Sequence, residues 1–249
     1  MNAIAIIAAL DRELKPLVEG WKKSAVEFQG KTFLIYERQN PEQHGMIAVA
    51  GGIGSHAAEL AARAVIAQYH PEALISAGLA GALIRSLKVG CIVTPNVIMD
   101  SNSGNEYRCT LGDNLIAGGV LVSAGEIAGQ ESKQKLVEDF HALAVDMEAA
   151  AVAEVARDAG IGFCCVKAIS DESGFPMLPL NQFVSPAGDF LTGKFVLWAM
   201  LRPWTWGRVI ALGRNSSHAT RALCDWLKEH VARGLQPGKV IRLEPATNV

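Results

Sequence analysis

Short apolar runs alternate with helical patterns along most of the chain. The longest helical patterns, rich in Ala and Leu, cover residues 55–68, 131–140 and 147–159. The apolar, β-branched runs that predict strands, each bounded by Gly, Asp or Pro, cover residues 3–9, 32–36, 46–50, 73–77, 91–97, 120–122, 144–145 and 162–169. Strands that alternate with helices of this length are typical of an α/β fold with a largely parallel sheet.

The composition fits a folded protein with a sizeable core. The chain has 249 residues, of which 50% are apolar and 19% charged, and its formal net charge is -2. This balance excludes intrinsic disorder and gives no general attraction to nucleic acid. Five cysteines without a CxxC spacing make neither a disulfide framework nor a zinc site, and no run is long enough to cross a bilayer. We therefore expect a cytoplasmic protein without a metal.

The composition changes after residue 172. Residues 174–186 are rich in Pro, Gly and Phe without a clear period, which is typical of a loop. Residues 193–233 carry seven Lys or Arg against two acids, together with four of the five tryptophans. We expect one domain over residues 1–233, with 174–233 as a distinctive Trp/Arg-rich segment and 234–249 as a flexible tail.

A glycine turn, Gly51-Gly52-Ile53-Gly54, lies between a predicted strand and a predicted helix. It matches a dinucleotide-binding turn, but that motif requires an acid at the end of the next strand, and Glu72 precedes the strand instead. The turn fits better as a source of backbone N–H groups, from Gly52 and Gly54, for a phosphate, a ribose or a water. Close packing of helix against strand is the alternative.

Three further motifs lie where predicted strands end or helices begin. They are GLAG at residues 78–81, VDMEAAA at 145–151 and KAISDE at 167–172. The small side chain of Gly78 would let a ligand approach the backbone at the end of a parallel strand. The acids of the other two motifs are each compatible with an ordinary helix cap or turn.

Together and in this order, these motifs resemble the nucleoside phosphorylase and nucleosidase family. The series is a first strand followed by Asp11-Arg12-Glu13, then GGIG, GLAG, VDMEAAA and KAISD. The nearest likeness is to methylthioadenosine/S-adenosylhomocysteine nucleosidases, over residues 1–171. After residue 175 the chain is more similar to the hopanoid-associated phosphorylases, which carry an Arg-Pro-Trp segment and a basic C-terminal helix. The resemblance implies a three-layer α/β/α sandwich with a mixed, largely parallel central sheet.

Cleavage of an N-ribosidic bond gives these residues distinct tasks. Glu148 would accept hydrogen bonds from the ribose 2′ and 3′ hydroxyls and favour the developing cation, with Met147 against the ribose face. Asp171 would donate a proton to the base N7, which requires a pKa raised by burial. By resemblance Asp171 indicates an adenine base, and Ile127 lies where the family stacks the base, often with an aromatic residue.

The nucleophile stays open between water and phosphate. By resemblance Glu13 matches the carboxylate that activates water in nucleosidases, whereas its neighbour Arg12 falls where related phosphorylases bind phosphate. Ser76 stands where those phosphorylases have another phosphate-binding arginine, and Leu79 replaces a small polar residue of the nucleosidases. No cofactor is expected, and phosphate is the one candidate co-substrate.

The Trp/Arg-rich segment bears on the substrate. Tryptophan beside arginine is typical of a membrane-surface element, and equally of a core or a dimer interface. By resemblance to the hopanoid-associated family, the substrate would be a lipid-linked adenine nucleoside such as adenosyl-hopane, reached at the inner face of a membrane. The alternatives are a nucleosidase for small methylthioadenosine-type substrates and an inactive nucleoside-binding protein. Relatives imply a homo-oligomer.

Overall fold

The computed structural model describes residues 3–38, 45–111 and 118–231. Its strands are β1 (Ala3–Ala8), β2 (Lys22–Phe28), β3 (Lys31–Arg38), β4 (Gly45–Ala50), β5 (Ala73–Ala82), β6 (Ile92–Val93), β7 (Val97–Asp100), β8 (Glu106–Arg108), β9 (Val120–Ser123), β10 (Ala144–Asp146) and β11 (Gly162–Asp171). Its helices are α1 (Asp11–Leu14), α2 (Ser55–Tyr69), α3 (Gln130–Phe140), α4 (Ala149–Ala159), α5 (Thr192–Met200) and α6 (Trp206–Val231), with short 3-10 turns η1 (Leu180–Phe183) and η2 (Pro203–Thr205). The expected tail, 234–249, lies outside the described residues.

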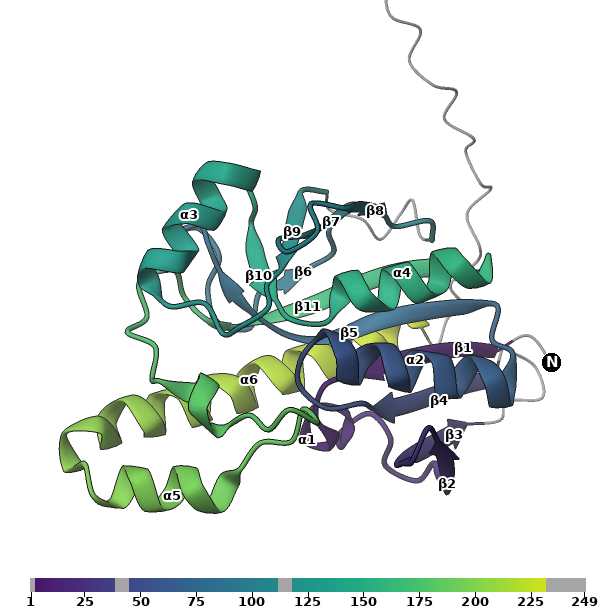
Figure 1. Ribbon diagram of the computed structural model, residues 1–249, viewed down its shortest axis with the longest axis horizontal. Helices are drawn as coiled ribbons and strands as arrows, with labels where there is room; N and C mark the ends of the chain where they lie inside the picture. Colours follow the sequence, from purple (N-terminus) through teal and green to yellow (C-terminus); the bar gives the residue numbers. More distant parts are fainter. Residues whose placement is uncertain (1–2, 39–44, 112–117, 232–249) are drawn as a thin grey trace, which may run out of the picture.

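Helices cover both faces of one mixed sheet, which confirms the predicted α/β sandwich (Figure 1). Alternate residues of β1 explain the layers, because successive side chains of a strand point to opposite faces. Ala5 and Ile7 pack in the cluster that contains α2 and α4, whereas Ile4 and Ile6 pack in the cluster that contains α1 and α6. The pairings β4–β1, β1–β5, β5–β11, β10–β9 and β9–β7 are parallel, and β5–β10 and the outer hairpins are antiparallel.

The second glycine motif lies inside a strand and not after one. β5 continues through Gly78 and Gly81 to Ala82, because β11 pairs with it over nearly its whole length and β10 pairs with its last residues. The predicted strand end at residue 77 was therefore wrong. A register shift between Ile169 and Asp171 marks the place where β11 reaches the end of β5.

Other predicted boundaries also change. The strand expected over 91–97 is two strands, β6 and β7, separated by Pro95, which has no N–H to donate to a ladder. The helix expected to begin at Met147 begins at Ala149, with Glu148 as its N-cap. The loop expected over 174–186 contains η1. Strands β2 and β8, on the two edges of the sheet, were not predicted.

The C-terminal segment forms a lobe beside the sheet. In Figure 1, α5 and the first turns of α6 project at the lower left, and α6 then runs back along the sheet to pack against β11 and β5. Phe183, Phe190, Phe195 and Trp198 form a cluster of ring contacts at the base of this lobe. No helix in the described ranges is both long and apolar enough to span a bilayer.

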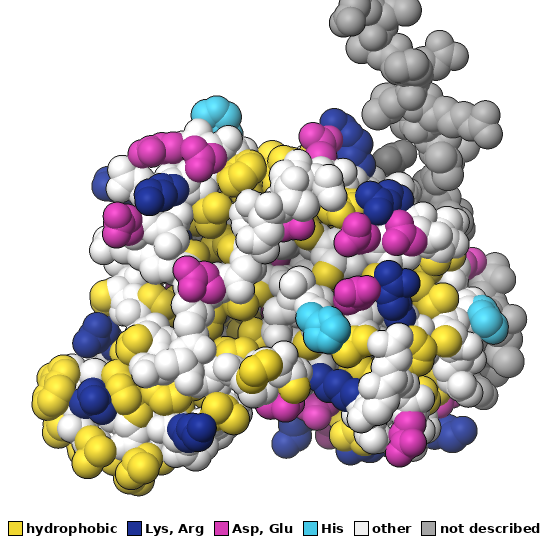
Figure 2. Space-filling view, viewed as in Figure 1, with side chains coloured by type: hydrophobic (Ala, Val, Ile, Leu, Met, Phe, Trp, Pro, Cys, Tyr) yellow, Lys and Arg dark blue, Asp and Glu magenta, His cyan; other side chains and the backbone are white. Residues whose placement is uncertain are grey.

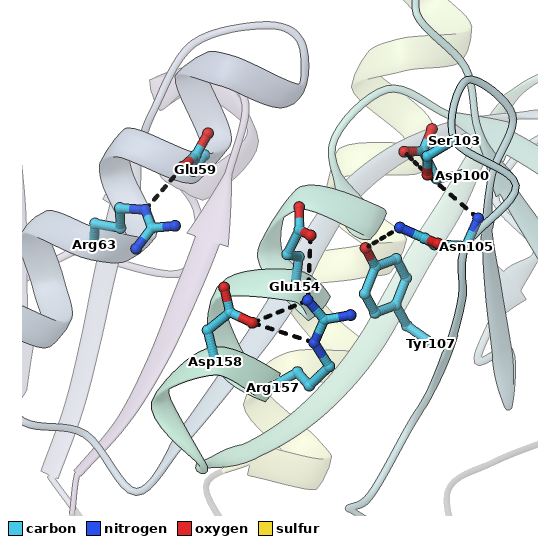
Figure 3. Close-up of polar contacts among 9 residues, drawn as sticks. All are labelled: Glu59, Arg63, Asp100, Ser103, Asn105, Tyr107, Glu154, Arg157 and Asp158. Carbon is cyan, nitrogen blue, oxygen red and sulfur yellow. Dashed lines mark hydrogen bonds and ion pairs between the residues drawn. The ribbon is translucent and has the colours of Figure 1, made fainter.

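The outer face of α4 carries exposed polar contacts (Figure 3). Arg157 pairs with Asp158 and Glu154 and lies over the ring of Tyr107, 5.2 Å from its centroid. The Arg157 side chain is 56% exposed, so solvent screens these pairs. These exposed pairs are a suitable control for a buried ion pair.

Candidate active site

One cavity of about 640 Å³ gathers the predicted chemistry. Each acid follows the end of a strand: Glu13 comes after β1, Glu148 after β10, and Asp171 ends β11. All three line the cavity, together with Met147 and Ile127. The volume falls in the range of about 300–1,000 Å³ that is usual for small-molecule sites.

Glu148 is fixed at the start of α4 by backbone donors. The N–H of Gly54 donates to Glu148 Oε1 at 2.9 Å, and the N–H of Met147 approaches Oε2 at 3.3 Å. Burial, followed by the charge of Asp146, raises the pKa of Glu148 to about 7. A carboxylate held at a helix N-terminus in this way is a ready acceptor for hydroxyl groups.

Glu13 and Arg12 are neighbours in sequence but lie in different surroundings. Glu13 is buried on α1, and burial raises the pKa of its carboxyl group above the usual value. The thiol of Cys224 on α6 donates to the backbone carbonyl of Glu13 at 3.2 Å, which anchors α1 from behind. Arg12 also lines the cavity but is exposed to solvent. A buried carboxyl group with a raised pKa suits a general base.

Asp171 has a partner that the sequence did not indicate. Lys133 Nζ on α3 lies 2.5 Å from Asp171 Oδ2, and each side chain is 5% exposed. The hydroxyl of Ser170 donates to Asp171 Oδ1 at 2.8 Å. Both carboxylate oxygens of Asp171 therefore accept from a donor, and its predicted transfer of a proton to the base N7 stays a prediction.

A second buried lysine lies behind the acids. Lys167 Nζ is 2.7 Å from Asp146 Oδ2. Burial lowers the pKa of Lys167, but Asp146, Cys165 and Glu148 raise it more, so that its pKa is raised overall. The motif containing Lys167 was singled out from the sequence, but no role was predicted for this side chain.

The predicted glycines support the lining from behind. Gly54, at φ +95°, provides the N–H bound by Glu148, and a Cβ added at Gly78 would lie 3.3 Å from Glu13 Oε2. Gly52, at φ +113°, lies against the carbonyl of Gly188, 3.2 Å from the position of an added Cβ. None of the three is among the residues that line the cavity. Their predicted contact with the substrate stays a prediction.

Asn181 on η1 is a further residue that sequence reasoning missed. Its Oδ1 accepts the N–H of Ile127 at 2.8 Å, and its Nδ2 donates to the Ile127 carbonyl at 3.3 Å. This double contact ties the loop after β9 to the start of the C-terminal segment. A polar residue inside a Pro-rich loop carries no periodic signal that could have revealed it.

The C-terminal segment contributes several apolar side chains to the cavity. Phe190, Phe195, Val209 and Leu212 line it. Ser216, Ser217, Thr220 and Arg221 of α6 also line the cavity and add polar groups to it. No group of three or more His, Cys, Asp or Glu able to hold a metal ion occurs in the part of the chain that the structure describes.

Comparison with known proteins agrees with this geometry. A family described as the "Phosphorylase superfamily" matches residues 3–113 and 106–176, so the chain belongs to the phosphorylase superfamily. This confirms the resemblance, and with it the predicted class of enzyme, one that cleaves N-glycosidic bonds.

The matches to individual relatives cover most of the length of those relatives. A 5'-methylthioadenosine/S-adenosylhomocysteine nucleosidase of Staphylococcus epidermidis is 28% identical over 172 residues, 57% of this chain and 75% of that protein. An aminodeoxyfutalosine nucleosidase of Campylobacter jejuni is 25% identical over 203 residues, 70% of this chain and 87% of that protein.

A solved structure shares the fold. It is a mutant methylthioadenosine nucleosidase of Helicobacter pylori with 5'-methylthioadenosine in its active site, and it matches with a TM-score of 0.70 at 18% identity. The match covers 94% of this chain and 99% of that chain.

Proposed function

We propose that this protein cleaves the N-ribosidic bond of an adenine nucleoside, with water as the nucleophile and without a metal or redox cofactor. The observation that carries the proposal is the meeting of Glu13, Glu148 and Asp171 in one cavity. Similar proteins named as a 5'-methylthioadenosine/S-adenosylhomocysteine nucleosidase and an aminodeoxyfutalosine nucleosidase support the choice of substrate class.

Each acid takes one part of the reaction. Glu148 accepts the ribose hydroxyls and stabilises the positive charge that develops on the sugar, and Met147 packs against the ribose. Asp171 contacts the N7 edge of the adenine, and Ile127 covers the ring. Glu13 takes a proton from the water that attacks C1′.

Water is favoured over phosphate by the surroundings of Glu13 and Arg12. A phosphate dianion needs cations or several N–H groups around the attacking oxygen. The two arginines of the lining, Arg12 and Arg221, are both exposed, and Leu79 brings an apolar side chain to the same cavity. The buried carboxyl group of Glu13 suits a neutral nucleophile that must lose a proton.

The substrate carries an apolar 5′ substituent, of which a lipid-linked adenosine such as adenosyl-hopane is an example. Apolar side chains of the C-terminal segment line the same cavity as the acids: Phe190, Phe195, Val209 and Leu212. Such a wall stabilises a hydrocarbon by removing its surface from water, at about 25 cal/mol per Å². A small methylthioadenosine-type substrate is the second candidate, favoured by the nucleosidase from Staphylococcus epidermidis.

A lipid-linked substrate is met at a membrane, and the lobe has the composition to reach one. Seven large apolar side chains are exposed there; we call them the lobe tip: Val196, Leu197, Met200, Leu201, Trp204, Trp206 and Ile210. Figure 2 shows apolar atoms gathered on this lobe with basic side chains among them. Apolar and basic side chains together suit the surface of an anionic bilayer.

The test is adenine release, with and without phosphate, from an adenosine with a long apolar 5′ chain. Methylthioadenosine serves as the small substrate. Release of adenine and the 5-substituted ribose without phosphate is expected, with at least about a hundredfold loss in Glu13→Gln and little change in Arg12→Ala. A phosphate requirement with a sugar 1-phosphate product would overturn hydrolysis. Binding without release by the wild type would make the protein a nucleoside-binding protein.

A further inference from the structure

We propose that Lys133 is a positioning residue of the reaction: it pairs with Asp171 in the free protein and supplies, through Asp171, the proton that the leaving adenine takes up. This inference rests on the proposed function. It concerns the source of the proton, which Asp171 alone does not provide.

The place of Lys133 on its helix is unusual for a lysine. α3 is polar over most of its length, and within the helix Lys133 is the residue that is buried. Fully buried lysines are rare unless they are paired. Here the ammonium group is paired with Asp171 Oδ2 at 2.5 Å, and it also donates to the backbone carbonyl of Glu172 at 3.3 Å.

The surrounding backbone leaves room for this pair and for little else. A Cβ added at Gly81 would lie 3.0 Å from Asp171 Oδ2 and 3.1 Å from Lys133 Nζ. Gly81, Lys133 and Asp171 all line the cavity. The ion pair therefore belongs to the wall that the substrate meets, and not to the sheet core.

Both oxygens of Asp171 are engaged by donors. Lys133 donates to Oδ2 and Ser170 donates to Oδ1. A proton that leaves Asp171 for the base can therefore be replaced along one of these hydrogen bonds. The ammonium group of Lys133 carries the mobile proton nearest to Asp171.

The bond between C1′ and N9 breaks, and its electron pair passes into the adenine ring. Lys133 passes a proton to Asp171, and Asp171 passes one to N7, so that the lysine ends as a neutral amine and the aspartate as a carboxylate. Water adds to C1′ and loses a proton to Glu13, and exchange with solvent then restores both groups.

The experiment compares two leaving groups on the same sugar. Methylthioadenosine must protonate its base, whereas a 4-nitrophenyl 5-methylthioriboside releases a stable nitrophenolate without a proton. In Lys133→Met we expect kcat for the nucleoside to fall by about 10²–10⁴-fold, the usual size of a general-acid contribution, with little change for the nitrophenyl riboside. Equal losses on both substrates, or no loss on either, would overturn the proposal.

Lys133→Arg separates the supply of a proton from the holding of Asp171. Arginine keeps the positive charge and the ion pair but does not give up its proton in proteins. We expect this variant to fold, to keep its KM and to lose most of kcat on the nucleoside only. Full nucleoside activity in Lys133→Arg would reduce Lys133 to an electrostatic support and overturn its role as proton source.

Lys88→Met is the matched control. Lys88 pairs with Glu172, the residue next to Asp171, at 2.9 Å, but its side chain is 61% exposed. It should leave both substrates unaffected. Failure of the proposed function is distinguishable, because the wild type would then release no adenine at all. Failure of this inference alone leaves a wild type that releases adenine and a Lys133→Met that loses activity on neither substrate or equally on both.

Discussion

Lys167 Nζ lies 2.7 Å from Asp146 Oδ2 across the centre of the sheet, and the two side chains are 1% and 0% exposed. Lys167 belongs to β11 and Asp146 to β10, and both strands pair with β5. The pair lies beside Gly78 of β5, where an added Cβ would be in ordinary contact, 3.5 Å from Lys167 Nζ.

Asp146 connects the lysine to the first turn of α4 through hydrogen bonds. Its Oδ2 accepts the N–H of Ala149, and its Oδ1 accepts the hydroxyl of Ser123 at 2.6 Å. Ser123 in turn accepts the N–H of Ala150. The lysine thus fixes the first turn of α4, where Glu148 is the N-cap.

Removal of Lys167 alone should be strongly destabilising. Lys167→Met leaves the charge of Asp146 buried and unpaired, so we expect a loss of about 3–5 kcal/mol in the free energy of unfolding, measured by urea titration. Lys167→Met combined with Asp146→Asn should recover part of that loss, because no bare charge remains. A double variant that is less stable by the full sum of the single losses would contradict this account.

Arg157→Met is the surface control for that measurement. Its pairs with Glu154 and Asp158 are exposed on α4 (Figure 3), and solvent screens pairs of this kind, so we expect little change in the free energy of unfolding. A loss near that of Lys167→Met would mean that burial does not decide the cost.

The activity should depend on the ionisation of Glu148. Because burial and Asp146 raise its pKa to about 7, much of this group is protonated in weak acid, where it is a poorer acceptor for the ribose hydroxyls. We expect kcat/KM to rise with pH through about 7 in the free protein. Glu148→Gln should be poorly active at every pH, and a wild-type profile that is flat between pH 6 and 8 would exclude this requirement.

The same carboxyl group should lower stability as the pH rises. Its pKa is about 7 in the folded chain against an ordinary value of 4.5, so the folded state holds the proton more tightly between these values. Stability therefore falls across this window, by on the order of 3 kcal/mol from this group. Unfolding of wild type and Glu148→Gln at pH 5 and pH 8 measures it, since the glutamine variant should lose less.

Gly81→Ala should disturb the ion pair of Asp171 and Lys133 without breaking the strand. Gly81 does not have the positive φ that would exclude alanine, but the added methyl group would lie within 3.0–3.1 Å of both charged groups. We expect a fold that is kept, a KM for the nucleoside that rises and a kcat that falls by about tenfold or more. Gly104→Ala is the control. Gly104 lies in a loop with open space around it but has φ +75°, so the substitution should strain the backbone without a loss of activity.

The acids could be found from the sequence, and their partners could not. Glu13, Glu148 and Asp171 lie in short motifs next to strand ends. The apolar pattern predicts those strands, and the resemblance to the family rests on those motifs. Lys133 lies on a polar helix whose pattern predicts a solvent-facing lysine, and only the tertiary fold turns it toward Asp171. Likewise β5 looked complete at residue 77, because the glycines that follow have low strand propensity and are held by pairing on both sides.

The lobe tip exposes large apolar side chains beside basic ones. Trp204 is 73% exposed and Leu201 67%, and the neighbouring Arg202 lies over Trp198, with its guanidinium carbon 4.9 Å from the ring centroid. Burial of such side chains in the interface of a bilayer removes apolar surface from water, while Lys194 and Arg208 attract anionic headgroups. We expect the wild type to float with vesicles of phosphatidylglycerol and phosphatidylcholine, and less so as the salt concentration rises.

The matched variants separate a membrane surface from an interface between copies of this chain. Leu201→Arg with Trp204→Arg should abolish flotation and keep the turnover of methylthioadenosine, because neither residue lines the cavity. The predicted homo-oligomer is measured by sedimentation on the same proteins. If the double variant dissociates an oligomer and the wild type never binds vesicles, the lobe tip is an interface between subunits, and the substrate need not come from a membrane.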